Sequence, residues 1–255
     1  MSRRAPPWWR HHFDDAYYRL HAPLFSAQQS RTETAGIIAL MGLPLGARLL
    51  DVPCGWGRHA ALLDEAGYAV TGADLSFDML ARAPGSLSRA AADIRALPFA
   101  AAIFDGAFDV FTSFGLFGDD REDVRALAEL RRVLVPGGVF LLETMHRDEV
   151  IAQYAERDAW TLDDGTEITV RRRFDPVSGV SRERLTWQRG GESGEKRHAL
   201  RLRTATEVAA LLDTAGFGDV RWFGDWSGTR LSHRSPHLIA VARKPRSLAR
   251  PGTRT

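Results

Sequence analysis

The residues best suited to chemistry lie in the first third of the chain. Gly55 and Gly57 stand in the segment Asp51-Val-Pro-Cys-Gly-Trp-Gly57, and Asp74 follows seventeen residues after Gly57. Glycines let the backbone approach a ligand closely, and a carboxylate at a strand end can accept hydrogen bonds from both vicinal hydroxyls of a ribose. The pattern therefore indicates a nucleoside-binding turn. Because Gly55-x-Gly57-x-x-Ala60 also satisfies the loose dinucleotide pattern, the turn alone leaves the ligand undecided.

Strands and helices alternate around this turn. The expected strands cover residues 47–52, 68–73, 88–92, 108–112, 139–144, 219–226 and 237–243. The expected helices cover residues 57–66, a segment from Ser76, 121–134, and a last helix that opens at the capping box Thr204-Ala-Thr-Glu207 and ends at Gly216. Such alternation predicts an α/β fold with a doubly wound parallel sheet. The ligand crevice is expected at the carboxyl ends of its strands.

Three other segments frame this domain, which is expected to span residues 46–157 and 204–244. Residues 1–45 are expected to be helical and to form a separate preface. Residues 158–203 change to period-two patterning with turn sequences at Asp164-Gly165 and Pro176–Gly179, so an antiparallel β insertion is predicted. Residues 245–255 form a basic tail that is expected to be disordered.

The composition limits the function classes. The chain has 255 residues, 44% of them hydrophobic, and a net charge of +2, while its last thirteen residues alone carry five basic side chains. A nucleic-acid footprint needs positive charge on a folded face, so no nucleic-acid partner is expected. The single cysteine, Cys54, excludes an internal disulfide, and no apolar run is long enough to span a membrane. We expect a cytoplasmic protein without a metal, because the eight histidines show no metal-ligand spacing.

The glycine turn resembles motif I of the class I S-adenosylmethionine-dependent methyltransferases, with Pro53 in place of the first glycine. Asp74 matches the family's ribose-holding acid, and Asp93 matches the acid that reads the adenine amino group. Two later segments match the family's fourth strand and the helix and turn before its fifth strand, namely Phe108–Ser113 and Leu130–Gly138. The resemblance implies a Rossmann-like sheet of seven strands, six parallel and one antiparallel. It also implies an N-terminal helical lid over residues 1–45 and a β insertion after the fifth strand.

Within this family the chain looks most like bacterial enzymes that methylate sugars and other small secondary metabolites. Asp51–His59, Ser113–Phe117 and the β insertion suggest this subgroup. The resemblance implies S-adenosyl-L-methionine as cofactor and a small-molecule oxygen, nitrogen or carbon nucleophile as acceptor. Two alternatives stay open: an NAD(P)-dependent oxidoreductase, and a non-catalytic cofactor-binding or assembly module.

The resemblance also implies a set of cofactor-binding residues. An aromatic face from Tyr18, or from Tyr17 beside it, suits the positive sulfonium, and Arg31 suits the cofactor's carboxylate. Packing of the lid and a solvated helix face are the structural alternatives for these two positions. The full set is Asp51, Cys54, Gly55, Gly57, Asp74, Leu75, Asp93, Ile94, Ser113, Tyr18 and Arg31.

One base and one acceptor surface are predicted. His146 follows the fifth strand at the crevice edge, where a neutral imidazole could take a proton from the acceptor, or could simply be a polar cap. Four arginines of the insertion alternate along two strands, and they either hold an acidic acceptor or form a solvent face: Arg171, Arg173, Arg182 and Arg184. Trp160, Leu185 and Trp187 on the insertion are candidates for a homodimer contact.

Overall fold

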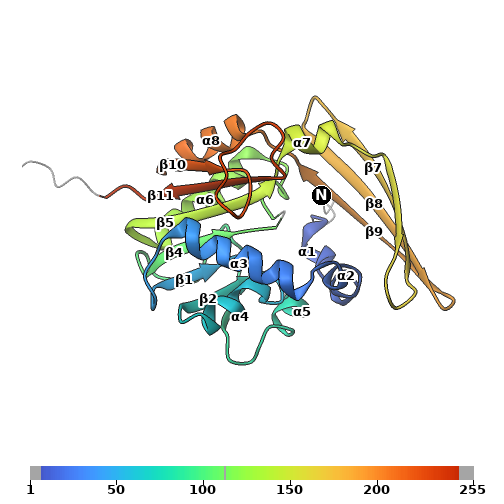
Figure 1. Cartoon of the computed structure of the whole chain (residues 1–255), viewed down its shortest axis with the longest axis horizontal. Coiled ribbons are helices and arrows are strands. Elements are labelled where there is room, and N and C mark those ends of the chain that lie inside the picture. Colours follow the sequence, from blue (N-terminus) through green and yellow to red (C-terminus); the bar gives the residue numbers. More distant parts are fainter. Residues whose placement is uncertain (1–6, 112, 247–255) are drawn as a thin grey trace, which may run out of the picture.

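A seven-stranded sheet forms the centre of the computed structural model, which describes residues 7–111 and 113–246 (Figure 1). The strands lie in the order β10-β11-β5-β4-β1-β2-β3. Their bounds are β1 Arg48–Asp51, β2 Ala69–Asp74, β3 Ser88–Ala91, β4 Phe104–Asp109, β5 Leu134–Met145, β10 Gly218–Phe223 and β11 His237–Arg243. β11 runs antiparallel to β5 and β10, and the other neighbours pair in parallel. The predicted sheet of six parallel strands and one antiparallel strand is confirmed.

Helices cover both faces of this sheet. α3 (Ala27–Met41) and α4 (Arg58–Glu65) pack on one face, and α6 (Asp120–Val133) and α8 (Ala205–Thr214) pack on the other. Neighbouring strand residues point to opposite faces, so Leu49 and Leu50 of β1 are buried in different apolar clusters. These two clusters fix the strand ends at one edge of the sheet, where β2 is followed by the short helix α5 (Phe77–Leu80).

The predicted insertion forms a second, four-stranded antiparallel sheet in the order β6-β7-β8-β9. Its strands are β6 Arg157–Thr161, β7 Glu167–Asp175, β8 Val180–Arg189 and β9 Glu192–Arg201, and α7 (Arg147–Ala152) leads into it. Figure 1 shows α1 (Trp9–His12) and α2 (Asp15–His21) between the two sheets. Leu20 of α2 shares a buried cluster with Leu162, Ile168, Val170 and Leu185, against which Trp160 and Trp187 pack. The side chains predicted for a dimer contact therefore belong to a cluster that contains Leu20 of α2.

Several element boundaries differ from the prediction, among them the start of β5 at Leu134 instead of 139 and the end of β10 at Phe223 instead of 226. The preface is four pieces, α1, α2, the short 3-10 helix Ala22–Leu24 and α3, because Asp14 and Ser26 each start a new helix by accepting a bond from a backbone N–H three residues on. β4 starts at Phe104 instead of 108. Asp105 interrupts the apolar pattern there, but its carboxylate reaches Arg48 Nη2 at 2.8 Å. β4 ends at Asp109, so Val110 and Phe111 follow the strand instead of belonging to it.

Two predictions concern the surface of the molecule and its termini. Among the described residues, no helix combines the length and the apolar character that a membrane span requires. Of the predicted tail, Pro245 and Arg246 are described, with the guanidinium of Arg246 beside Gly137. Residues 247–255 lie outside the described part of the chain.

Candidate cofactor pocket

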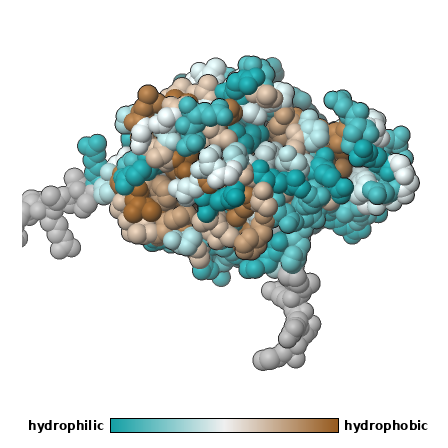
Figure 2. Space-filling view, turned by 90° about the horizontal axis from the view of Figure 1, so that it is seen from below, coloured by the Kyte–Doolittle hydropathy of each residue, from teal (hydrophilic) through white to brown (hydrophobic). Residues whose placement is uncertain are grey.

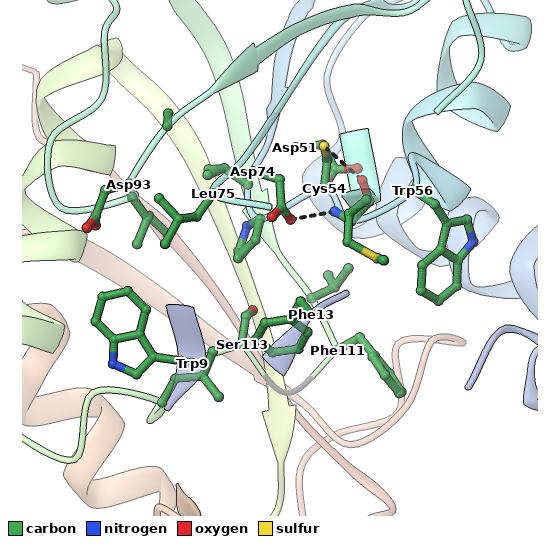
Figure 3. Close-up of a pocket in the computed structure, with 18 of the residues that line it drawn as sticks. Trp9, Phe13, Asp51, Cys54, Trp56, Asp74, Leu75, Asp93, Phe111 and Ser113 are labelled. Carbon is green, nitrogen blue, oxygen red and sulfur yellow. Dashed lines mark hydrogen bonds between the residues drawn. The ribbon is translucent and has the colours of Figure 1, made fainter. Parts of the chain in front are cut away.

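A pocket opens at the carboxyl ends of β1, β2 and β4. It encloses about 1010 Å³, including its open mouth. In Figure 3 the acids Asp93, Asp74 and Asp51 lie above the cavity, and Trp9, Phe13 and Phe111 face them from below. The floor comes from strand ends and the glycine turn, while the cover comes from α1, α2 and the loops after β4. Eight of the predicted cofactor-binding residues line it: Asp51, Cys54, Gly55, Asp74, Leu75, Asp93, Ile94 and Ser113.

Asp74 fastens the glycine turn to β2. Its Oδ2 accepts the N–H of Gly55 at 2.8 Å and its Oδ1 accepts the N–H of Ser76 at 2.8 Å. The side chain is 8% exposed, and this burial raises the pKa of Asp74. Each carboxylate oxygen has a further lone pair, so hydroxyl groups of a ligand can still donate to it. The predicted strand-end acid therefore faces the pocket in a fixed orientation.

Positions 55 and 57 differ in the space that surrounds the missing side chain. Gly55 has φ +54°, and a Cβ there would meet no atom within 4 Å, so the missing side chain keeps the pocket open. Gly57 has φ +75°, and a Cβ there would lie 3.1 Å from Leu87 Cδ2 and 3.3 Å from Ala83 Cβ. Both positions need left-handed backbone, which costs glycine least. Gly57 is thus a packing residue of the turn and is absent from the pocket lining.

Asp51 and Cys54 are buried below the turn. Burial and the nearby carboxylates of Asp74 and Asp109 raise the pKa of Asp51 well above its ordinary value. Burial, with Asp51 and Asp74 beside it, also raises the pKa of the Cys54 thiol. The sulfur of Cys54 packs closely against Gly72, because a Cβ at position 72 would lie only 2.9 Å from it. Cys54 is therefore a protonated packing group that forms part of the wall, and not a nucleophile.

The end of the pocket at Asp93 is closed by a stacked arginine. Arg95 donates to Asp93 from Nε at 2.9 Å and from Nη2 at 2.6 Å, and this pairing lowers the pKa of Asp93. The guanidinium carbon lies 4.8 Å from the ring centre of Trp9 and 4.6 Å from that of Phe117. Cation–π contact of this kind holds the aromatic cover in place. The sequence did not reveal this group, because its members come from three separate segments.

The opposite end contains Arg58, which the sequence analysis did not assign to ligand binding. Its side chain is 11% exposed, forms an ion pair with Glu33 of α3, and lies 4.5 Å from the ring centre of Phe25. Burial raises the pKa of Glu33, but the hydrogen bond from His59 and the charge of Arg58 outweigh burial and hold it at about 2. In the sequence, the place of Arg58 directly after the glycine turn was the feature that could have marked it as a ligand-binding residue.

Besides Gly57, three predicted residues lie outside the pocket lining. The ring of Tyr18 contacts Trp56 and Arg82, while Tyr17 is the tyrosine that lines the cavity. Arg31 is exposed on α3. His146 is 2% exposed, and its Nδ1 lies 3.0 Å from the carbonyl oxygen of Ser235. This contact ties the start of α7 to the segment before β11. A ring enclosed in this way does not support the predicted role of His146 as a base.

The loop after β4 brings an aromatic ring to the mouth. Phe111 has φ +66°, an unusual conformation for a bulky residue, and its N–H donates to Glu143 Oε2 at 2.8 Å. Glu143 is in turn held by His237 Nδ1 at 2.7 Å. Ser113 donates to Asp109, whose pKa burial raises to about 8. Within residues 7–111 and 113–246, no cluster of three metal-ligating side chains is present.

Comparisons with known proteins agree with this geometry. Residues 50–142 match a family described as a methyltransferase domain. A malonyl-[acyl-carrier protein] O-methyltransferase of Pectobacterium atrosepticum is 34% identical over 149 residues, which cover 57% of this chain and 56% of that protein. A demethylmenaquinone methyltransferase of Renibacterium salmoninarum is 36% identical over 132 residues, or 49% of this chain and 54% of that protein. The chain thus matches little more than half the length of these two relatives.

The solved structures extend the similarity to almost the whole chain. The CcbJ methyltransferase from Streptomyces caelestis superposes with a TM-score of 0.78 and 17% identity, covering 92% of this chain and 99% of that one. S-Adenosylmethionine-bound CalS10, an amino pentose methyltransferase from Micromonospora echinaspora, gives a TM-score of 0.70 and 24% identity, covering 90% and 97%. At these identities the likeness concerns the fold.

Proposed function

We propose that this chain is a class I S-adenosylmethionine-dependent methyltransferase that transfers the cofactor's methyl group to a small-molecule oxygen, nitrogen or carbon nucleophile. The observation that carries this proposal is Asp74, whose carboxylate is buried, lines the pocket and keeps free lone pairs beside the open turn at Gly55. When bound, S-adenosylmethionine supplies an electrophilic methyl group on a sulfonium. The protein's own residues have to bind, align and dehydrate the reactants.

The pocket residues suit the parts of this cofactor. Asp74 would hold the ribose, the side chains of Leu75 and Ile94 would enclose the adenine, and Asp93 would accept from its amino group while still paired to Arg95. Arg58 would hold the carboxylate, in place of the exposed Arg31. The aromatic faces around the cavity suit a sulfonium, whose positive charge is attracted to ring faces.

Among the described pocket residues, neither the phenol, the thiol nor the imidazole is arranged to take a proton from the acceptor molecule. The pKa of Tyr17 is raised by burial and by the charge of Asp74, and the pKa of Cys54 is also raised. His59 is 5% exposed and bonded to Glu33 at 2.9 Å. We therefore propose that alignment and exclusion of water carry the reaction, because a displacement at a sulfonium needs little acid–base assistance.

The cofactor is the part of the proposal to test first. Calorimetric titration of the whole chain with S-adenosylmethionine and, separately, with NAD⁺ and NADP⁺ should give binding of the first alone. Tight binding of a nicotinamide dinucleotide with none of S-adenosylmethionine would favour the oxidoreductase alternative. Binding of S-adenosylmethionine without methyl transfer to a panel of amino sugars, phenols and carboxylic acids would favour the non-catalytic module.

Three finer expectations accompany this proposal. The small net charge of the whole sequence supports a small-molecule acceptor over a nucleic acid. Cytoplasmic location stays a prediction. A homodimer through the insertion also stays a prediction, and it would need surfaces other than Leu185 and its neighbours, which pack on α2.

A further inference from the structure

The outer face of the insertion sheet is covered by arginine. Side chains alternate along the strands, so one face holds the apolar cluster around Leu185 and the other is free. All four strands contribute exposed arginines to the free face, which we call the arginine face: Arg157, Arg171, Arg173, Arg182, Arg184 and Arg197. In Figure 2 the insertion, on the right, is mostly hydrophilic. None of the six lines the cofactor pocket.

The strand register stacks these arginines directly opposite one another. Arg157 pairs with Arg171, Arg171 with Arg184, and Arg184 with Arg197, so one row of four crosses the sheet. Adjacent strands are about 4.8 Å apart, which makes the row roughly 15 Å long. Like charges at directly opposite positions destabilise a sheet. A face that only needed to be polar would not require this arrangement.

Internal acids neutralise only part of this charge. Glu195 pairs with both Arg184 and Arg197 at one end of the row. The remaining four arginines form no ion pair with another described residue. Asp175, at the margin, turns its carboxylate into its own loop, where Ser178 donates to it at 2.6 Å. The arginine face is therefore short of anions, and guanidinium groups pair best with carboxylates in a two-bond geometry.

The neighbouring side chains indicate which kind of anion fits. Ala159, Thr169, Thr186 and Ala199 lie on the same side of the strands. They offer no aromatic platform for unpaired bases and no apolar anchor for a bilayer. Trp160 and Trp187 pack on the opposite face. The two acids on this side are already engaged, Glu167 by the amide of Gln188 and Glu195 by Arg184 and Arg197. The rest of this basic surface therefore suits the carboxylates of a folded partner.

We propose that the arginine face is a docking surface for an acidic protein. The partner's carboxylates form ion pairs with the arginines that have no acid of their own in the sheet. This surface is separate from the methyl-transfer pocket. Docking does not depend on the proposed catalytic function, because none of the arginines contributes to the cofactor site. Removing three of the four arginines that have no internal ion-pair partner should weaken docking and relieve repulsion in the sheet.

The test uses the full chain and a synthetic carboxylate polymer, poly-L-glutamate, at physiological salt. The variant Arg171→Gln/Arg173→Gln/Arg182→Gln should bind it at least tenfold more weakly, by fluorescence anisotropy, with an unchanged or higher unfolding midpoint. The matched control is Arg121→Gln/Arg125→Gln/Arg234→Gln, which removes three exposed arginines elsewhere and should change affinity less than twofold. Poly-uridylate and phosphatidylserine vesicles are titrated in parallel.

The outcomes separate the possible occupants. Stronger binding of poly-L-glutamate than of the other two polyanions, lost in the first variant alone, supports an acidic protein partner. Stronger binding of poly-uridylate or of vesicles through the same arginines overturns the proposal in favour of those partners. Equal losses in both variants, or no binding by the wild-type chain, also overturn it, because the arginine face would then have no special affinity for anions.

Discussion

Asp74 holds the turn and lines the pocket with the same carboxylate. Replacing it by alanine removes the acceptor of the Gly55 and Ser76 N–H groups and the proposed partner of the ribose. We expect Asp74→Ala to weaken S-adenosylmethionine binding by about 1–3 kcal/mol, measured by calorimetry. The control is Asp78→Ala, an exposed acid on α5. Equal affinity in wild type and Asp74→Ala would remove this residue from the cofactor site.

Replacing Arg58 and replacing Arg31 should have different effects on binding of the cofactor's carboxylate. S-Adenosylhomocysteine carries this carboxylate, whereas 5′-methylthioadenosine has the same nucleoside without it. Arg58→Gln should raise the Kd of the first ligand about tenfold and leave that of the second unchanged, because one charge-assisted bond is lost. Arg31→Gln should alter neither, since Arg31 is exposed and outside the pocket lining. Loss of affinity for both ligands in Arg58→Gln would indicate damage to the turn.

At the scale of elements, the lid rests on buried imidazoles. Burial, together with the charges of His198 and Lys196 of β9 and of His21 of α2, lowers the pKa of His12 to about 3, while Asp14 acts in the opposite direction. The pKa of His12 in the unfolded chain is near 6.5, so the folded lid favours the neutral ring. This stability is complete above pH 6.5 and is lost as the pH falls towards 3.

We therefore expect the free energy of unfolding to fall by the order of 2–3 kcal/mol between pH 7 and pH 4 through His12. Urea unfolding at several pH values measures this. His12→Gln should flatten the slope between pH 6.5 and 4 relative to wild type. His11→Gln, a change in the exposed neighbouring residue, should keep the wild-type slope. An identical slope in all three proteins would mean that His12 titrates normally in the folded chain.

Local signals predicted elements well where one segment contains all the information. Thr204 and Glu207 form the predicted capping box, with both reciprocal bonds present. The direction in which a side chain points was harder to predict from the sequence. Successive residues of a strand point to opposite faces, so an error of one residue in the register reverses the prediction. His146 stands at a strand end as predicted, yet its ring is enclosed beside Ser235. Trp9, Arg95 and Phe117 meet only through tertiary folding, and no spacing in the sequence encodes that contact.

At the scale of the whole molecule, a buried ion pair joins the insertion to the main domain. Arg203 is 2% exposed and pairs with Asp123 of α6, which is 1% exposed. Both residues keep one buried polar atom without a hydrogen-bond partner in the described structure, Arg203 Nε and Asp123 Oδ1. The backbone N–H of Arg201 also donates to the Gly115 carbonyl at 3.1 Å, beside the pocket loop.

Arg203→Met should therefore reduce the free energy of unfolding by about 3–5 kcal/mol, because it strands a buried carboxylate. The double variant Arg203→Met/Asp123→Leu should recover most of this loss, since both charges are then replaced by apolar groups. Urea denaturation of the three proteins measures the effect. If the double variant is as unstable as the single one, the pair contributes through packing instead of charge.

α2 contacts both the pocket and the insertion. Tyr17 lines the pocket, while Leu20, less than one helical turn further on, sits in the hydrophobic cluster of the insertion. Replacing the insertion by that of another enzyme would thus remove the side chains against which Leu20 packs. Tyr17, on the same short helix, would then be displaced from the pocket. Chimaeras designed to change acceptor preference should exchange residues 7–25 and 158–203 as a matched set, and a swap of either part alone should forfeit affinity for the methyl donor.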